Sequence, residues 1–125
     1  MRTVQTANII NKFHNVKVIK DPLLIEIDQG IFTGRYKNSY TEEENKLRFN
    51  RDANCGMESY QSVAKRTIQF IEQLSKYKFK NIFIITHNCN ASILENLLKN
   101  IEIDYSNPNH LRCFKNAEVK NITYK

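Results

Sequence analysis

The sequence of 125 residues has no tryptophan and only three glycines, two prolines and three cysteines. Three cysteines are an odd set and too sparse for the disulfide framework of a small secreted domain, so we expect reduced thiols. No apolar run approaches the roughly 20 residues that a membrane helix needs. The N-terminal stretch also lacks the continuous apolar segment of a secretory signal. These absences predict a cytoplasmic protein that has no membrane partner.

Charge adds a weaker clue about partners. The formal net charge is +6, which is compatible with a nucleic-acid binder. However, the basic residues do not cluster, and Lys76, Lys78 and Lys80 alternate with aromatic residues where a helix is expected to end. Lysine, asparagine and isoleucine are all abundant, as an AT-rich coding sequence would produce. We therefore expect no nucleic-acid partner.

The pattern of apolar residues predicts a single domain over residues 1–125, with alternating helices and strands. No internal repeat or flexible linker interrupts the chain. Helices are expected at 1–13, after Thr41, at 59–77 and after His87, and strands are expected at 16–20 and 82–85, with a last extended segment at 117–125. This order predicts an α/β protein with a mainly parallel sheet, and it lacks a strand before the first helix.

Two local signals add detail to this outline. Thr41 is followed three residues later by Glu44, which is the signature of a capping box at the start of a helix. Gly30 and Gly34 mark a loop that must bend tightly or approach another part of the chain closely.

His87 ends the apolar run Ile82–Ile85, just where the next helix begins. Open α/β sheets bind their ligands at the carboxyl ends of their strands, and the free N–H groups of a helix start favour anions. His87 is therefore a candidate anion ligand. The alternative is a polar residue at a strand end whose hydrogen bond goes to a neighbouring carbonyl.

A metal site is a further alternative for the same region. His87 and Cys89, with His110 and Cys113, form two pairs that could be zinc half-sites. The spacing of the first pair is short, and Cys89 is expected in the first turn of a helix. We therefore expect neither a metal nor any other cofactor.

Several motifs occur in an order that resembles one family. They are RTVQTA (2–7), LIEIDQGIFTGR (24–35), GMES (56–59) with Arg66 behind it, ITHNCN (85–90) and NAEV (116–119). Over essentially the whole chain this order is similar to the histidine phosphatase superfamily, which is also called phosphoglycerate-mutase-like.

The resemblance implies a three-layer α/β/α fold and phosphoryl transfer through a phosphohistidine. It implies that Arg2 binds the phosphate, that Glu26 is the general acid or base for the leaving group, and that His87 holds the transferring phosphoryl oxygens. Phosphoryl transfer needs such groups because negative charge spreads over three oxygens in the transition state. Part of Glu26 is expected to be desolvated, because it lies between two isoleucines. Alternatively, Glu26 faces outward from a strand and Arg2 is a solvated residue at a chain start.

The resemblance also places Glu58, from GMES, near the phosphate. A carboxylate that interacts with a helix dipole is an equally good account of Glu58. Asn88 stands where the family usually has a glycine, and asparagine tolerates left-handed backbone angles better than most residues. We therefore list Glu58 and Asn88 as candidate phosphate-binding residues.

Besides Asn88 in place of a glycine, the sequence departs from the family in a second way, which concerns the nucleophile. The family carries it in an Arg-His-Gly motif at the end of its first strand, and this sequence has no such motif. We therefore expect a chain that is truncated before Met1 and lacks the first strand of its sheet. An upstream segment or a partner chain would supply that strand.

The leading functional hypothesis is a phosphohydrolase of this family, acting on a small phosphorylated metabolite. A phosphatase is favoured over a mutase because the segment between Gly34 and Gly56 is short. The alternative is a catalytically inactive module that binds phosphate or another protein. A basic nucleic-acid binder is the third and least supported hypothesis.

Overall fold

The computed structural model describes residues 2–123, so the first residue of the expected N-terminal helix and the last two of the expected C-terminal segment lie outside it. Its α-helices are α1 (Arg2–Asn11), α2 (Glu42–Asn50), α3 (Tyr60–Leu74), α4 (Asn88–Leu98) and α5 (Pro108–Leu111). Short 3₁₀ turns occur at η1 (Pro22–Leu24), η2 (Gly30–Phe32), η3 (Lys37–Ser39) and η4 (Ala53–Cys55). No helix within this range is long and apolar enough to cross a membrane.

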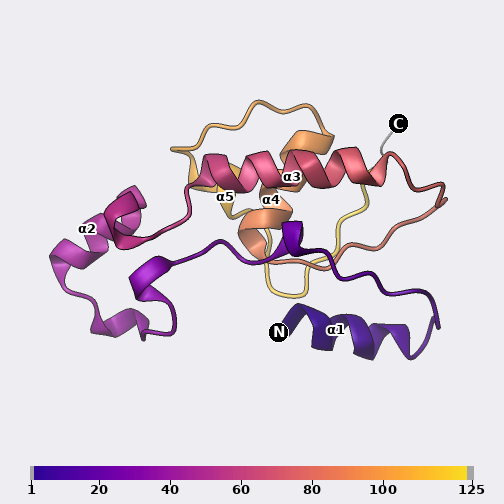
Figure 1. The fold of residues 1–125 in the computed structure, drawn as a ribbon, viewed down its shortest axis with the longest axis horizontal. Helices are drawn as coiled ribbons and strands as arrows, with labels where there is room; N and C mark the ends of the chain where they lie inside the picture. The colour runs from indigo at the N-terminus through magenta and orange to yellow at the C-terminus, as the bar shows by residue number, and fades with distance from the viewer. Residues whose placement is uncertain (1, 124–125) are drawn as a thin grey trace.

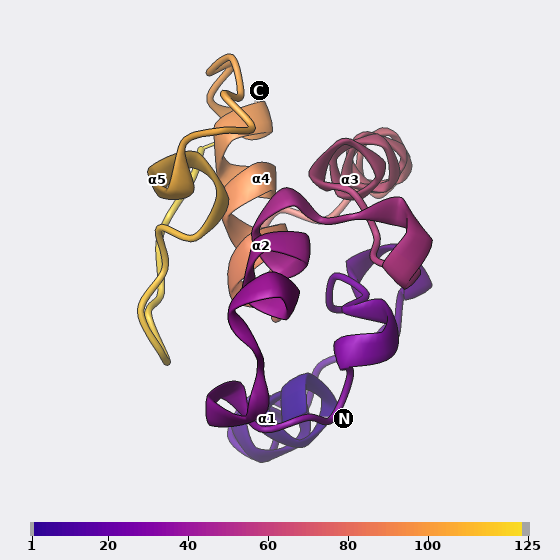
Figure 2. The same ribbon diagram turned by 90° about the vertical axis from the view of Figure 1, so that its left-hand side faces the viewer.

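Helices α3 and α4 form the centre of the molecule. They pack against each other, α5 packs against α4, and η1 packs against α3. In Figure 1, α3 runs across the molecule and α1 lies on the opposite side from it. Figure 2 shows α2 in front of this assembly, between α5 and α3. Helix α1 buries none of its residues, so it contributes little to the core.

The α/β/α fold with a parallel sheet, expected from the sequence, is wrong. Between residues 2 and 123 the structure has no β-strand. A strand exists only within a hydrogen-bonded ladder. The backbone groups of residues 80–86 form no hydrogen bond with any other described residue. Ile82 and Phe83, which a sheet would bury, are 44% and 59% exposed. The apolar pattern identified a segment suited to a strand, but no neighbouring strand pairs with it here.

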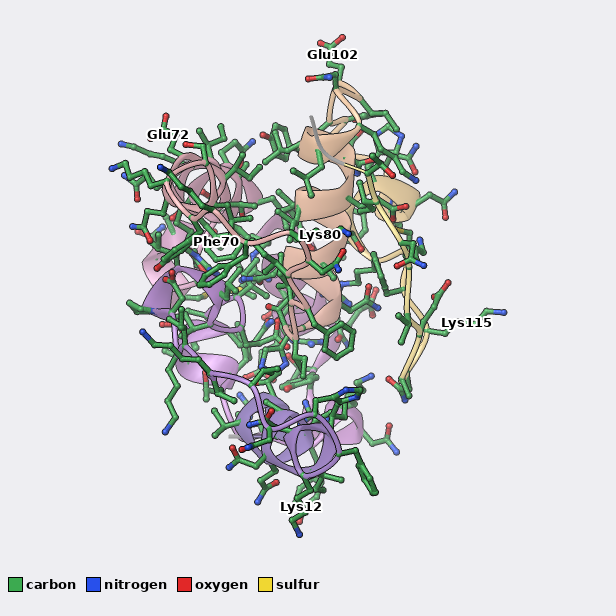
Figure 3. All side chains as sticks on the ribbon, turned by 90° about the vertical axis from the view of Figure 1, so that its right-hand side faces the viewer. Lys12, Phe70, Glu72, Lys80, Glu102 and Lys115 are labelled. Atoms are coloured by element: carbon green, nitrogen blue, oxygen red, sulfur yellow. The ribbon has the colours of Figure 1, made fainter. Side chains whose placement is uncertain are left out.

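The helices expected after Thr41 and from residue 59 are confirmed. The Thr41 hydroxyl accepts a hydrogen bond from the Glu44 N–H at 3.1 Å, and the Glu44 carboxylate accepts one from the Thr41 N–H at 2.9 Å. Ser59 caps α3 in the same way, by accepting a hydrogen bond from the Ser62 N–H. On α3, Phe70 points toward the interior and Glu72 points away from it (Figure 3).

The core consists of two clusters. The larger one joins α3, α4 and α5 and contains Ile27, Val63, Ala64, Cys89, Ile93 and Leu111. The smaller cluster contains Phe32, Cys55 and Met57, with Tyr40 packed against it. Ile27 belongs to the larger cluster. Because Ile27 directly follows Glu26, it anchors the segment that carries Glu26 to the core.

The loop at Gly30 is a close backbone approach, as the sequence predicts. Gly30 has a φ of +55°, and a Cβ atom on it would lie 2.0 Å from the carbonyl oxygen of Cys55. The backbone of η2 therefore lies directly against η4. The Glu58 N–H donates to the Asp28 carbonyl at 3.1 Å, which continues this contact toward the start of α3.

Candidate functional site

His87 lies at the point where residues 80–86 meet α4. It is the N-cap residue of α4, has extended backbone angles and makes no side-chain capping bond. Its carbonyl accepts a hydrogen bond from the Ala91 N–H at 2.8 Å. The backbone N–H groups of Asn88, Cys89 and Asn90 donate to no other described residue. The start of α4 therefore presents free donors and the positive end of the helix dipole next to the imidazole.

The structure brings Glu26 and His87 together. The Nδ1 atom of His87 lies 3.0 Å from Oε2 of Glu26. The side chain of His87 is 16% exposed and that of Glu26 is 44% exposed, so the pair is accessible from one side. Because Nδ1 faces the carboxylate, Nε2 is the ring nitrogen that remains for a ligand.

Two side chains hold the segment of Glu26 against the segment of His87. The Thr86 hydroxyl donates to the Leu24 carbonyl, and the Asn90 amide donates to the Ile25 carbonyl, both at 2.8 Å. Because Thr86 and Asn90 lie on either side of His87 in the sequence, these bonds fix the imidazole relative to Glu26.

Glu58 is held in a network of its own. Its carboxylate accepts two hydrogen bonds from Arg66, at 2.8 and 3.1 Å, and one each from the Ser62 hydroxyl and the Asp28 N–H. Burial raises the pKa of Glu58, but these hydrogen bonds, led by Arg66, outweigh it and hold the pKa below the usual value. Glu58 therefore stays ionised and serves to pin Asp28.

Arg66 contributes to the same anchoring. It also donates to the Leu23 carbonyl, so Glu58 and Arg66 together fix both ends of the segment that contains Glu26. Sequence reasoning noted Arg66 in the motif but gave it no role. The signal was present, because Glu58, Ser62 and Arg66 follow one another at four-residue spacing, which brings Glu58, just before α3, next to the helix face that carries Ser62 and Arg66.

Arg51 is a site residue that the sequence analysis missed. It ends α2 in a left-handed conformation, with a φ of +50°, and is only 8% exposed. Its guanidinium donates to the backbone carbonyls of Asp28 and Glu58. No motif marked it, because its position depends on a left-handed turn that arginine rarely adopts.

The other two predicted phosphate ligands are placed differently. The Asn88 amide donates to the Phe114 carbonyl at 2.8 Å and accepts from the Phe114 N–H at 3.1 Å, so its side chain is held at Phe114 while its backbone N–H stays free for a ligand. Asn88 is also the first residue of α4, and its φ is not positive. Arg2 is exposed at the start of α1, and its side chain has no hydrogen bond or ion pair with residues 2–123. The structure does not bring Arg2 into the network of Glu26, Glu58 and His87.

The two zinc half-sites do not meet. In the described part of the chain no three histidine, cysteine, aspartate or glutamate side chains are grouped as metal ligands. His110 accepts a hydrogen bond from the Asp104 N–H through Nδ1. Burial, and then the nearby charge of Glu26, raise the pKa of the Cys89 thiol to about 11, so Cys89 is neither a thiolate ligand nor a nucleophile at neutral pH.

The imidazole of His87 thus lies against a carboxylate at the start of α4, and the segment that carries this carboxylate is fixed by Arg51 and Arg66. A family model described as histidine phosphatase superfamily (branch 1) matches residues 1–125. The chain belongs to this superfamily. No curated protein matches the chain, and no solved structure does.

Proposed function

We propose that this chain carries the phosphate-binding half of a phosphohydrolase site that acts on a small phosphorylated metabolite. The observation that carries the proposal is the Glu26–His87 pair at the free start of α4. The Nε2 atom of His87 and the first N–H groups of α4 are donors of the kind that a phosphoryl group requires. Membership of the superfamily supports a phosphatase-type function.

In this scheme each residue has a distinct task. A protonated His87 donates through Nε2 to an oxygen of the transferring phosphoryl group while Nδ1–H stays bonded to Glu26. Glu26 orients the ring through Oε2 and, when it binds substrate as the protonated acid, gives its own proton to the oxygen of the departing alcohol, which leaves a carboxylate paired with the imidazolium. Glu58 and Arg66 act as positioning residues, because they hold the segment of Glu26 without reaching the substrate.

The nucleophile must come from elsewhere. The 125 residues contain no Arg-His-Gly motif. We propose that an upstream segment of the same polypeptide, or a partner chain, supplies both this motif and a strand that pairs with residues 81–86. The backbone of 80–86, which is unpaired within residues 2–123, supports this, because an apolar chain with free N–H and C=O groups is a template for an added strand.

The alternative is a catalytically inactive module that binds phosphate esters. The absence of the nucleophile motif from the printed residues favours it. A module of this kind needs the same donors at His87 and α4, so the two proposals share a binding site and differ only in turnover.

Hydrolysis of para-nitrophenyl phosphate tests the two proposals. The 125-residue chain is compared with a chain extended by any codons that lie upstream in frame. We expect turnover only in the extended chain, and its loss in the His87→Ala variant. The His14→Ala variant is the matched control, because His14 is exposed next to the end of α1. An extended chain that is inactive but still binds phosphate would establish the inactive module, and turnover that survives His87→Ala would contradict the site.

A further inference from the structure

A cavity of about 620 Å³ lies next to the site, and neither Glu26 nor His87 lines it. Its walls come from α2, the start of α3 and the chain around α5, which Figure 2 shows facing the viewer. Sites for small ligands have volumes of roughly 300–1,000 Å³. The cavity therefore has room for a group larger than phosphate.

Its walls carry positive charge without acidic partners. Arg48, Arg51 and Arg112 line it, and no aspartate or glutamate does. Within the described chain none of the three guanidinium groups is paired with a carboxylate. The Nε atom of Arg48 is buried and has no acceptor among the described residues. Arg51 and Arg48 already donate to protein acceptors, the carbonyls of Asp28 and Glu58 and the side chain of Asn45. Of the three, Arg112 is therefore the one best placed to bind an anionic ligand, in a wall of net positive charge.

The same walls carry aromatic rings. Phe49, Tyr60 and Tyr105 line the cavity, and Phe49 is 83% exposed although it is apolar. Tyr60 and Tyr105 pack against the larger core cluster, so their positions are supported from behind. The guanidinium carbon of Arg51 lies 5.1 Å from the centre of the Tyr60 ring. Aromatic and guanidinium faces of this kind stack on planar heteroaromatic rings.

Two residues connect the cavity to the Glu26–His87 pair. Arg51 lines the cavity and donates to the carbonyl of Asp28, two residues after Glu26. Leu111 lines the cavity and packs in the core cluster that contains Cys89, two residues after His87. The cavity and the Glu26–His87 pair are therefore connected through Arg51 and Leu111.

We propose that this cavity binds the leaving group of the substrate, and that this group is a nucleoside monophosphate, a planar base joined to a phosphate. The substrate class is then a nucleotide with two separate phosphate groups, one of which is transferred. The base stacks against the ring of Phe49, and Arg112 binds the phosphate that remains. This inference rests on the proposed function for the position of the transferred phosphate, whereas the binding of the leaving group can be tested on its own.

The test measures binding of four probes to the 125-residue chain: adenosine 5′-monophosphate, adenosine, ribose 5-phosphate and inorganic phosphate. We expect the monophosphate to bind at least about tenfold more tightly than adenosine or ribose 5-phosphate, because only it uses both rings and arginines. Ribose 5-phosphate that binds as tightly as the nucleotide would overturn the assignment of a base. Adenosine that binds as tightly would overturn the role of the arginines.

Variants separate the two parts of the ligand. Arg112→Gln should weaken binding of the monophosphate about tenfold and leave the affinity for adenosine unchanged. Phe49→Ala should weaken binding of both the monophosphate and adenosine and leave the affinity for ribose 5-phosphate unchanged. Phe13→Ala and Lys78→Gln are matched controls, since Phe13 is also 83% exposed and Lys78 is an exposed cation, and neither residue lines the cavity. If the control variants lost as much affinity for the monophosphate as Phe49→Ala and Arg112→Gln do, the proposal would be overturned.

A further variant distinguishes this inference from the proposed function. In His87→Ala the monophosphate should bind with unchanged affinity, because His87 does not line the cavity. If the wild-type chain binds the monophosphate but inorganic phosphate does not shift the NMR signal of the His87 imidazole, the proposed function fails and the cavity assignment stands. If the monophosphate does not bind at all, the cavity assignment fails whatever happens at His87.

Discussion

The imidazole of His87 and the carboxylate of Glu26 meet at 3.0 Å although they belong to distant parts of the sequence. Their contact is held by side-chain hydrogen bonds to backbone carbonyls, from Thr86 to Leu24 and from Asn90 to Ile25. A ladder between two strands would normally hold such segments, and here it is absent between residues 2 and 123. The arrangement of the site therefore depends on a few polar side chains.

The ion pair of Glu58 and Arg66 should contribute to stability in a pH-dependent way. Glu58→Gln should lower the free energy of unfolding at pH 7 by about 1–3 kcal/mol, because Arg66 then lies largely buried without its counter-ion. The folded-state pKa of Glu58 lies below its ordinary value of 4.5, so its contribution is complete above pH 4.5 and is lost as the pH falls through the folded-state value.

Urea unfolding of the wild type and the Glu58→Gln variant at several pH values measures this difference. The gap between the two proteins should be widest near pH 7 and should narrow below pH 4.5. Glu42→Gln is the control, since Glu42 is exposed and its ion pair with Lys46 is a surface pair. A gap that stays constant down to low pH would contradict the role of the Glu58 charge.

Gly30 and Gly34 provide a matched pair for testing the close approach of η2 to η4. Gly30→Ala should destabilise the protein by more than about 2 kcal/mol, because its Cβ would overlap the backbone of Cys55. Gly34 also has a positive φ, but nothing lies within 4 Å of its Cβ position, so Gly34→Ala should cost only the backbone strain of about 1 kcal/mol. Thermal unfolding of both variants measures the difference, and equal losses would show that η2 and η4 do not touch.

The α3–α4 contact should account for much of the stability of the core. Ile93 on α4 has no exposed surface, so Ile93→Ala should cost about 2–5 kcal/mol. Ile68 on α3 is 45% exposed, and Ile68→Ala should cost less than about 1 kcal/mol. Denaturant titration of the two variants tests this, and similar losses would be inconsistent with the packing described above.

Cys89 should be unreactive although it lies in the first turn of α4. Its pKa is about 11, so roughly one molecule in a thousand carries a thiolate at pH 8, and the side chain is buried. Mass spectrometry after brief treatment with iodoacetamide should find Cys113, which is partly exposed, modified at least about tenfold faster than Cys89. Faster modification of Cys89 would mean that the start of α4 opens to solvent.

The features that were predicted correctly are local ones. The capping box of Thr41 and Glu44 and the helix expected at 59–77 depend on residues within one or two turns of each other, so a short window of sequence specifies them. The sheet was not predictable in this way, because the strand preference of residues 82–85 says nothing about whether a neighbouring strand is present. Whether residues 82–85 form part of a sheet depends on hydrogen bonds to a strand that is distant in the sequence.

The candidate site shows the same division. The order of the family motifs predicted Glu26 and His87 as site residues, and the structure brings these two residues together. Arg51 and Arg112 carried no motif, since their approach to one cavity depends on the left-handed end of α2 and on the packing of α5. Arg2 matched a motif, but within residues 2–123 its side chain forms no hydrogen bond or ion pair with the other candidate residues.

The most direct test of the central claim is an NMR titration of the imidazole signals of the 125-residue chain with inorganic phosphate. The chain has three histidines, and His87→Gln assigns the signal of His87. The account predicts that the His87 signal shifts in a saturable way while those of His14 and His110 do not move. A His87 signal that does not change, or three signals that shift together, would contradict a phosphate site at the start of α4.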